Sequence, residues 1–370
     1  MARYRGLVRG LLQSALACAV LVSACGGAET TDVHGPQYLG QLKLRDGATL
    51  DGTAIGGLSG LSYDRDGDLY YLISDDRSAK NPARFYTARI TLSDSGIEDV
   101  DFVGTHPLLD ADGKPFAPLN ADARPPVVPP DPEGIAVDVG RQRIYWSSEG
   151  ERQGEAMLDP SVRIADLDGG YLGEFTLPPM LHMSGEETGP RRNVGLEGLS
   201  LSPDGRHLWA AMEGPRYDDG ELPSEADGAL VRITKFDVET RAATAQYTYR
   251  VDAVASGPGG DNGLSELVAV DDDEFLVLER GYGTHVQARL YRVVIGDADD
   301  VLARPSLRDA PVQTMTKTLL VDLAGAVDPI DNLEGMTLGP TLPDGRQALV
   351  LVSDDNFSAD QFTQFLAFAL

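Results

Sequence analysis

The stretch NVGLEGLSLSPDGRHLWAAMEG, residues 193–214, decides the fold that the sequence predicts. Two apolar runs flank a Pro-Asp-Gly turn, an arrangement typical of a β-hairpin. Glu197 lies near the start of the first run, and Glu213 lies at the end of the second. Because the strands of a hairpin run in opposite directions, both carboxylates are expected at its open end.

Related stretches occur four more times along the chain, which indicates a repeat architecture. They are GGLSGLSYDRDGDLYYLISDDR (56–77), DPEGIAVDVGRQRIYWSSEG (131–150), NGLSELVAVDDDEFLVLERG (262–281) and NLEGMTLGPTLPDGRQALVLVSDD (332–355). The anchor positions of the five copies are spaced by 74, 64, 69 and 68 residues; they are Ser59, Glu133, Glu197, Glu266 and Glu334. Strand-forming segments separate the copies, and hardly any segment has the period of a helix.

Four antiparallel strands in every repeat of this length are typical of a β-propeller. The sequence therefore predicts an all-β propeller of five four-stranded blades, with a sixth, degenerate blade left open. The last repeat offers two strands and then QFLAFAL (364–370). The segment 38–46 can supply its missing strand, so we expect the two ends of the chain to pair and close the ring.

The first residues of the chain are interpreted as an export signal. Arg3, Arg5 and Arg9 precede a short apolar run, and LVSAC resembles a bacterial lipoprotein box with Cys25 as the lipidated residue. An ordinary secretory signal is the alternative. We expect an exported lipoprotein, periplasmic or on the cell surface, with the outer membrane favoured if the host has one. The predicted division is a signal peptide (1–24), a linker (25–37) and a single propeller domain (38–370).

The composition narrows the range of partners. The formal net charge is −27 and becomes −30 once the three arginines of the signal are removed. Nucleic acid is therefore excluded as a partner by charge repulsion, and a membrane is expected only through the lipid anchor.

The only cysteines are Cys18 and Cys25, so the mature domain has no disulfide to stabilise it and needs a core. We expect a monomer.

The paired acids of the repeats are expected at one mouth of the central channel. In a propeller blade the first strand begins, and the second strand ends, at the same mouth. Glu133 with Glu149 and Glu197 with Glu213 are both 16 residues apart, as is Ser59 with Asp75. Glu266 with Glu279 and Glu334 with Asp354 keep the pattern at other spacings. The prediction is a mouth crowded with about nine acids.

Like charges in this number raise one another's pKa and need a neutralising partner. Calcium is one candidate, because it takes six to eight hard oxygen ligands. The candidate ligands are the nine acids with three asparagines: Asp75, Glu133, Glu149, Glu197, Glu213, Glu266, Glu279, Glu334, Asp354, Asn193, Asn262 and Asn332. Arginine is the other candidate, because Arg77, Arg152, Arg216 and Arg280 each closely follow a second-strand acid. Salt bridges from these arginines offer a purely structural interpretation of the mouth.

A long loop, 178–192, leads into the opening stretch and brings Arg191 and Arg192 beside Glu197. Arginines next to an acidic, metal-ready mouth suit a phosphate or carboxylate group. The predicted anchors for a small anionic ester or phosphoester are Arg77, Arg191, Arg192, Arg216 and Arg280. Solvated loop charge is the alternative for Arg191 and Arg192.

The segments GGLSGLSYD, DPEGIA, NVGLEGLSLSPDG and NLEGM give the sequence a resemblance to the phytase-like domain family, labelled "esterase-like activity of phytase". The resemblance covers roughly residues 38–370 and implies an exported β-propeller with ester or phosphoester hydrolase activity. The positions that match the family are Glu133, Glu197, Glu266 and Glu334, with Asp75, Arg77, Glu149, Glu213 and Asp354.

Three functional hypotheses follow. The first is a calcium-dependent hydrolase with Glu133, Glu197 and Glu213 as catalytic residues, in which a carboxylate activates water. The second is a calcium-dependent lactonase, as in paraoxonase-like and gluconolactonase propellers. The third is a non-catalytic propeller that binds a ligand or partner protein at the cell envelope.

Overall fold

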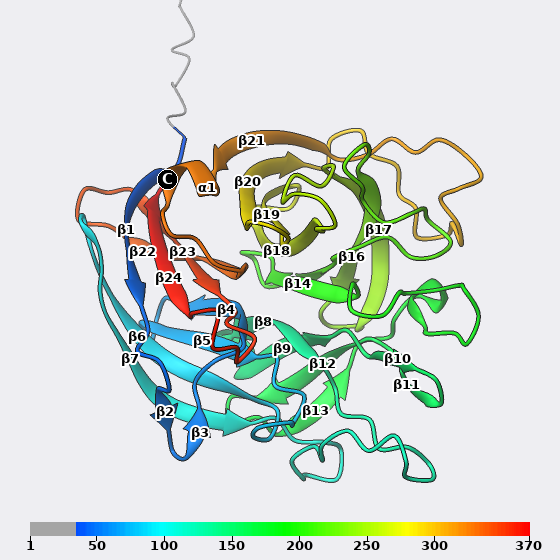
Figure 1. The fold of residues 1–370 in the computed structure, drawn as a ribbon, viewed down its shortest axis with the longest axis horizontal. Coiled ribbons are helices and arrows are strands. Elements are labelled where there is room, and N and C mark those ends of the chain that lie inside the picture. The colour runs from blue at the N-terminus through cyan, green and yellow to red at the C-terminus, as the bar shows by residue number, and fades with distance from the viewer. Residues whose placement is uncertain (1–34) are drawn as a thin grey trace, which may run out of the picture. The chain divides into compact units, whose positions relative to one another are not determined.

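The computed structural model describes residues 35–370, which form a β-propeller of five four-stranded blades (Figure 1). The predicted signal peptide and Cys25 lie outside the described residues. The blades are numbered here in the order of their first strands. Blade 1 consists of β4 (Leu58–Asp64), β5 (Leu69–Ser74), β6 (Arg84–Ser93) and β7 (Gly96–Pro107). Blade 2 consists of β8 (Pro132–Asp138), β9 (Arg143–Ser148), β12 (Ser161–Asp166) and β13 (Tyr171–Glu174). Blade 3 consists of β14 (Leu196–Leu201), β15 (His207–Met212), β16 (Ala229–Asp237) and β17 (Ala242–Val251). Blade 4 consists of β18 (Gly263–Ala269), β19 (Glu274–Gly281), β20 (Gln287–Val294) and β21 (Thr316–Asp322).

Blade 5 closes the ring with strands from both ends of the described chain. It consists of β22 (Leu333–Thr341), β23 (Gln347–Ser353), β24 (Gln364–Ala369) and β1 (Gln37–Lys43). The outermost strand, β1, runs antiparallel to β24, as Figure 1 shows. The predicted closure is therefore confirmed, and the count is five blades rather than six.

The blades pack face to face around the channel, and each interface has its own apolar core. The inner strands β4, β8, β14, β18 and β22 contact one another in ring order. Five separate clusters of buried side chains fill the spaces between neighbouring blades, and Trp146 and Trp209 are among their largest members. Because both faces of a blade are covered, its strands are apolar in runs rather than in strict alternation.

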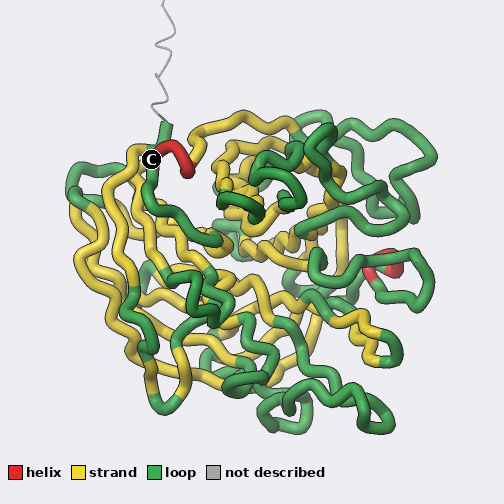
Figure 2. The backbone as a smooth tube through the Cα atoms, viewed as in Figure 1, coloured by secondary structure: helices red, strands yellow, loops and turns green. Residues whose placement is uncertain are grey.

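Regular structure outside the blades is sparse (Figure 2). Two short hairpins, β2 (Thr49–Leu50) with β3 (Thr53–Ala54) and β10 (Glu151–Gln153) with β11 (Ala156–Leu158), extend from the ring. The helical pieces are α1 (Leu323–Ala326) and two 3₁₀ turns, Val139–Arg141 and Pro179–Leu181. None of the helices in residues 35–370 is long and apolar enough to cross a membrane.

Every inner strand is bulged near its first residue. The pairing with the second strand is interrupted after Leu58, Pro132, Leu196, Leu264 and Leu333, so that the next residue is left out of the ladder. In blades 2 and 3 the glycine that follows is left out as well. A β-bulge turns the extra side chain away from its regular direction, and bulges are frequent beside functional sites. The bulged residues are Ser59, Glu133, Glu197, Ser265 and Glu334.

Candidate functional site

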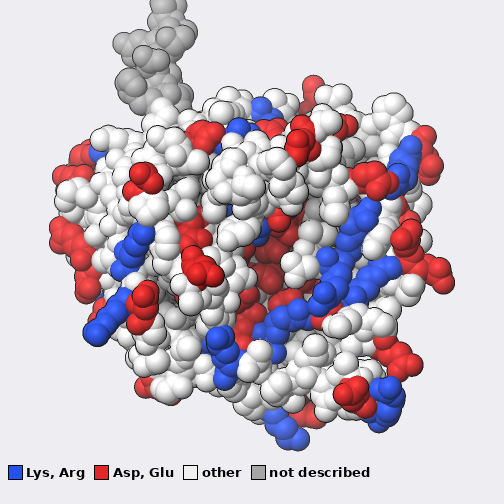
Figure 3. Space-filling model, in the orientation of Figure 1, with Lys and Arg blue, Asp and Glu red and all other residues white. Residues whose placement is uncertain are grey.

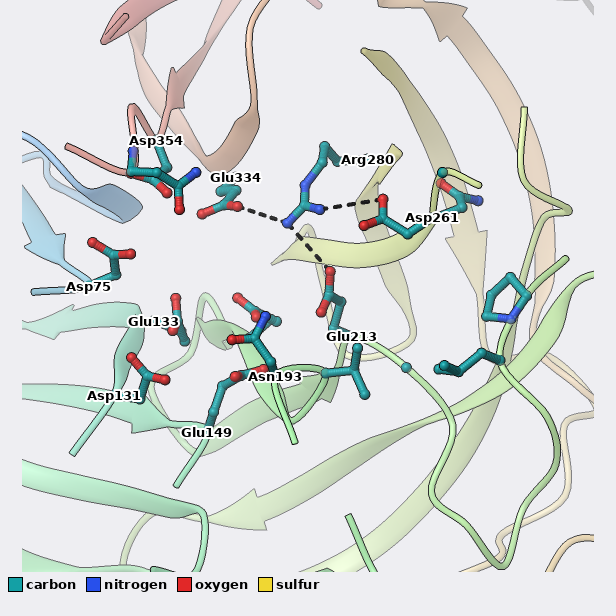
Figure 4. A pocket seen from close by; sticks show the side chains of 18 of the residues that line it. Asp75, Asp131, Glu133, Glu149, Asn193, Glu213, Asp261, Arg280, Glu334 and Asp354 are labelled. Carbon is teal, nitrogen blue, oxygen red and sulfur yellow. Dashed lines mark hydrogen bonds and ion pairs between the residues drawn. The ribbon is translucent and has the colours of Figure 1, made fainter. Parts of the chain in front are cut away.

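Nine carboxyl groups line a cavity of about 520 Å³ at one mouth of the channel (Figure 4). They are Asp75, Asp131, Glu133, Glu149, Glu197, Glu213, Asp261, Glu334 and Asp354. Two arginines, Arg77 and Arg280, share the lining. Figure 3 shows the result, a hollow with a red floor and blue side chains along one flank.

The repeated hairpin places most of these acids. Three of them are bulged residues of inner strands: Glu133, Glu197 and Glu334. Four more directly follow the paired part of a second strand: Asp75, Glu149, Glu213 and Asp354. The backbone N–H groups of Asp75 and Glu213 donate to the carbonyls of Gly57 and Gly195, each at 2.8 Å, so these acids occupy the same place in their blades. The sequence prediction placed these seven acids at one mouth, and the structure brings all seven together.

Glu149 lies at the centre of the acidic cluster. It forms one compact group with Asp131 and Glu133 and another with Glu197 and Glu213, and in each group the carboxylate oxygens lie within 4.8 Å of one another. Its Oε1 also accepts a hydrogen bond of 2.6 Å from the backbone N–H of Gly195. A cation could therefore reach three carboxylates at once from either side of Glu149.

Burial makes the ionised form of these groups costly. Burial, with the neighbouring carboxylates of Asp131 and Glu213, raises the pKa of Glu149 to about 8. Burial also raises the pKa of Asp131 and of Glu213 to about 7, although Arg77 and Arg280 respectively oppose the rise. Without a bound cation, part of the cluster is therefore protonated at neutral pH.

Glu133 and Glu197 are shifted in the same direction. Burial and the charge of Glu197 hold the pKa of Glu133 well above its usual value. Burial, Glu149 and Glu213 do the same for the pKa of Glu197. Buried carboxyl groups with raised pKa values are candidates for proton transfer.

Blade 4 contributes a positive charge where the other blades contribute an acid. Its Gly263 pairs with Arg280, so Arg280 takes the place that Glu213 has in blade 3. The guanidinium donates to Glu334 at 2.7 Å and lies 3.4 Å from Glu213 and 3.8 Å from Asp261 (Figure 4). Burial lowers the pKa of Arg280, but the surrounding carboxylates outweigh burial and raise it. These contacts support the predicted role of Arg280, which is to neutralise the acids at the mouth.

Two acids predicted at the mouth lie elsewhere, because the repeat in blade 4 is shifted by one residue. The bulged residue is Ser265, not Glu266, and the residue paired with Leu264 is Glu279. Glu266 accepts hydrogen bonds from the backbone N–H groups of Leu199, at 3.0 Å, and Leu267, at 2.9 Å. It is buried among the inner strands and does not line the cavity.

Glu266 stands where the other blades have glycine. These glycines are Gly60, Gly134, Gly198 and Gly335. A β-carbon on Gly134 would lie 2.5 Å from the carbonyl oxygen of Glu197, which shows how closely the inner strands approach at this level. The side chain of Glu266 fills the space beside Gly198, since its Oε1 would lie 2.9 Å from a β-carbon there.

Glu279 belongs to a different polar cluster, between blades 3 and 4. It accepts hydrogen bonds from Tyr249 Oη at 2.5 Å, Lys317 Nζ at 2.6 Å and Asn262 Nδ2 at 2.9 Å. It does not line the cavity. Asn262 borders the cavity, but its amide nitrogen is directed to Glu279.

The other two predicted asparagine ligands differ from each other. Asn193 lines the cavity (Figure 4), and its backbone has φ +56°, in the left-handed region that asparagine tolerates. Asn332 lies behind the lining and donates to Glu334 Oε1 at 2.9 Å. It therefore orients Glu334 rather than facing the cavity itself.

Two predicted arginine anchors are engaged away from the cavity. Arg216 is buried and forms ion pairs with Asp218 and Asp219, at 2.6 and 3.3 Å. Arg191 stacks on the ring of Tyr217, 4.0 Å from its centroid, and donates to two backbone carbonyls. These contacts engage both guanidiniums, so the structure does not support them as substrate ligands.

Three functional candidates were not predicted: Asp131, Asp261 and Glu151. Asp131 precedes Glu133 by two residues, the offset that separates Asn332 from Glu334, and this offset is a signal in the sequence. Glu151 is fully buried under Arg77 and Arg192. Asp261 precedes Asn262 in a loop, and nothing in the repeat pattern marks it.

The donor set fits calcium. Every group that faces the cavity other than the arginines and apolar side chains offers oxygen, the ligand type that calcium prefers. Asp75 Oδ1, in the lining, is a buried atom without a hydrogen-bond partner among the described residues. Buried acceptors without partners are rare in proteins and are explained where a cation or water is bound.

Several solved structures share a limited likeness with this chain. A protein from Lactobacillus plantarum is 14% identical, with a TM-score of 0.33 over 81% of this chain and 79% of that one. The periplasmic gluconolactonase of Pseudomonas aeruginosa is 12% identical, with a TM-score of 0.37 over 91% and 98%. A family 43 β-1,3-galactosidase in complex with galactodeoxynojirimycin is 10% identical, with a TM-score of 0.46 over 88% and 94%.

No curated protein matches the sequence. The model of the phytase-like family, described as "esterase-like activity of phytase", matches residues 53–357. This match runs from before the first inner strand to the loop after the last acid of the mouth. The chain therefore belongs to the phytase-like family of β-propellers.

Proposed function

We propose that this chain is an exported, lipid-anchored hydrolase that cleaves an ester or phosphoester of a small anionic molecule at a calcium site in the acidic cavity. The observation that carries the proposal is the convergence of nine carboxyl groups on one cavity of about 520 Å³. Packing alone does not require such a cluster, and its charge destabilises the fold unless it is neutralised. Membership of a family described by esterase-like activity supports the reaction class.

Calcium, when bound, would supply a fixed positive charge that polarises a phosphoryl or carbonyl oxygen. Glu149, Glu197 and Glu213 are the residues that would hold it, because their oxygens already lie within 4.8 Å of one another. Gly195 fixes the Glu149 carboxylate through its backbone N–H. Asp75 and Asp354 lie in the same lining and can complete the oxygen donors.

Glu133 is the best candidate for a general base. It lies with Asp131 and Glu149 in the cluster, where burial and the neighbouring carboxylates raise its pKa, and the charge of a bound calcium ion would oppose that rise. A carboxylate with this property can take a proton from an attacking water and return it to the leaving oxygen. Glu197 and Glu213 remain candidates for the same task, since both line the cavity.

The test is a substrate panel of phosphate monoesters, carboxyl esters and lactones, assayed with calcium and with a chelator on wild type and Glu197→Gln. We expect turnover of one class with calcium, loss of that turnover in the chelator, and a loss of at least about 100-fold in Glu197→Gln. Glu239→Gln is the matched control, because Glu239 is an exposed acid that pairs with Arg141 outside the cavity.

Two results would replace this proposal by another function. If calcium raises the melting temperature but no substrate is turned over, the chain is a non-catalytic binding propeller. If only lactones are hydrolysed, the chain is a calcium-dependent lactonase. If neither calcium nor Glu197→Gln changes the melting temperature, the acid cluster has a structural role.

Lipid anchoring has a separate test. Cys25→Ser should release the protein from the membrane fraction of cells, because the thiol is the attachment point of the lipid in this proposal. An unchanged distribution between membrane and soluble fractions would contradict the anchor without affecting the proposed reaction.

A further inference from the structure

Glu151 holds two arginines at the edge of the acidic cavity. Its side chain is fully buried, and its carboxylate accepts from Arg77 on one oxygen and from Arg192 Nε, at 2.7 Å, on the other. Arg77 also lies 3.3 Å from Asp131 and lines the cavity. A buried carboxylate shared by two guanidiniums fixes the position of both.

The surrounding loop orients Arg192 and engages its neighbours. Arg152 donates to the carbonyls of Thr188, at 3.1 Å, and Pro190, at 2.9 Å, and so holds the loop that carries Arg192. Arg191 is stacked on Tyr217, whose other contact is Arg152, 4.6 Å from the ring centroid. Both guanidiniums therefore have structural contacts that account for them.

Arg192 differs from these neighbours because it keeps hydrogen-bond donors that no described residue engages. Its side chain is 49% exposed, and within residues 35–370 only its Nε has a partner. It shares the Glu151 carboxylate with Arg77, and Arg77 lines the cavity. Glu151 therefore holds Arg192 beside Arg77, with the terminal N–H groups of Arg192 available as donors.

We propose that Arg77 and Arg192, oriented by Glu151, bind a phosphate group of the substrate at the rim of the acidic cavity. A guanidinium presents paired donors that match the oxygens of phosphate. An acidic cavity repels anions, so a substrate with a phosphate group needs cationic side chains at the entrance. Glu151 is the positioning residue in this arrangement, and the proposal rests on the proposed function of the cavity.

The probe is inorganic phosphate, titrated calorimetrically into the full chain with calcium present at a concentration that keeps calcium phosphate soluble. Arg192→Gln should weaken binding about 10- to 100-fold, the effect of losing hydrogen bonds to a charged group. Glu151→Gln should weaken it as well, because both guanidiniums lose their fixed partner. Acetate should bind more weakly than phosphate to the wild type.

Arg250→Gln is the matched control. Arg250 is 50% exposed and pairs with Asp227, so its loss removes the same charge from an equally exposed side chain outside the cavity. Its affinity for phosphate should equal that of the wild type. Arg192→Lys keeps the charge without the paired donors and should fall between wild type and Arg192→Gln.

Wild-type affinity in Arg192→Gln would overturn the proposal, and a lower melting temperature in that variant would then show that Arg192 only stabilises the loop. The result is separable from the proposed function. If Arg192→Gln loses phosphate binding while wild type hydrolyses nothing, the anchor stands and the hydrolase fails. If turnover of a phosphorylated substrate keeps its KM in Arg192→Gln, the hydrolase stands and the anchor fails.

Discussion

Blades 3 and 4 have the same strand order and the same bulge, yet they contribute opposite charges to the cavity. Blade 3 offers Glu197 and Glu213, whereas blade 4 offers Ser265 and Arg280 at the corresponding backbone positions. Blade 4 also has Glu266 where blade 3 has Gly198. A repeat can therefore keep its backbone while one copy supplies the counter-charge for the others.

The largest expected effect comes from removing that counter-charge. Arg280→Met leaves Glu213, Glu334 and Asp261 without their shared cation, and breaking a buried ion pair in this way costs about 3–5 kcal/mol. Urea unfolding in a chelator measures the loss. Calcium should restore part of it, and Arg250→Met, at an exposed pair, should change stability by less than about 1 kcal/mol. Equal stability of Arg280→Met and wild type would mean that the acids are neutralised without Arg280.

The next largest effect concerns the inner-strand position at which blade 4 has Glu266 and the other blades have glycine. In Gly134→Ala, the new β-carbon would lie 2.5 Å from the Glu197 carbonyl oxygen, so the inner strands must move apart. We expect a loss of about 1–3 kcal/mol in the free energy of unfolding. Gly185→Ala is the control, because a β-carbon there meets no atom within 4 Å. Two alanine variants of equal stability would contradict close packing of the inner strands.

The acids contributed by blades 2 and 3 should make stability depend on pH when calcium is absent. The pKa of Glu149 is raised to about 8, and those of Asp131 and Glu213 to about 7, so the folded state holds protons that the unfolded state releases above about pH 4.5. Stability should therefore fall as pH rises from about 5 to 8, by about 1.4 kcal/mol per pH unit for each extra proton held.

The measurement is the melting temperature at pH 5.5 and pH 8 with chelator and with calcium. Calcium takes over the role of the protons, so its stabilising effect should be larger at pH 8. A melting temperature in chelator that is higher at pH 8 than at pH 5.5 would show that the cluster does not control stability.

The smallest effect concerns Glu266. Burial raises its pKa well above the usual value, although three backbone N–H groups oppose the rise. Glu266→Gln keeps an oxygen for these donors and should cost about 1 kcal/mol or less. Glu266→Ala leaves the N–H groups of Leu199 and Leu267 without an acceptor and should cost more. Equal stability of the two variants would show that water replaces the carboxylate.

The sequence predicts the architecture well because the repeat and its turns are local signals. The Asp-Gly turns, the apolar runs and the spacing of Ser59, Glu133 and Glu197 identify the blades without any knowledge of packing. Ring closure follows from the count of strands in the last repeat. The seven acids that meet at the mouth follow from hairpin geometry alone.

The errors in the site arise where the pattern allows two alignments. Glu266 and Glu279 imitate the acid pair of blade 3, although the bulge in blade 4 falls at Ser265. A shift of one residue reverses the direction of a side chain, and periodicity does not determine where a bulge lies. The Gly-Leu step that precedes Ser59, Glu197 and Ser265 was the better guide.

The arginines could not be assigned from the sequence for a different reason. Arg191 and Arg192 are adjacent, but one stacks on Tyr217 and the other pairs with Glu151. Arg216 is buried with Asp218 and Asp219, which are its near neighbours in the chain. Long side chains in loops take their direction from contacts between loops. These contacts follow no sequence periodicity from which they could be predicted.

The closure of blade 5 has a consequence for the order in which the molecule can assemble. Strand β1, near the start of the described chain, pairs with β24, which ends one residue before the last. During synthesis β1 has no partner until β24 has emerged, so the ring cannot close before blade 5 is made. Such long-range pairing slows folding.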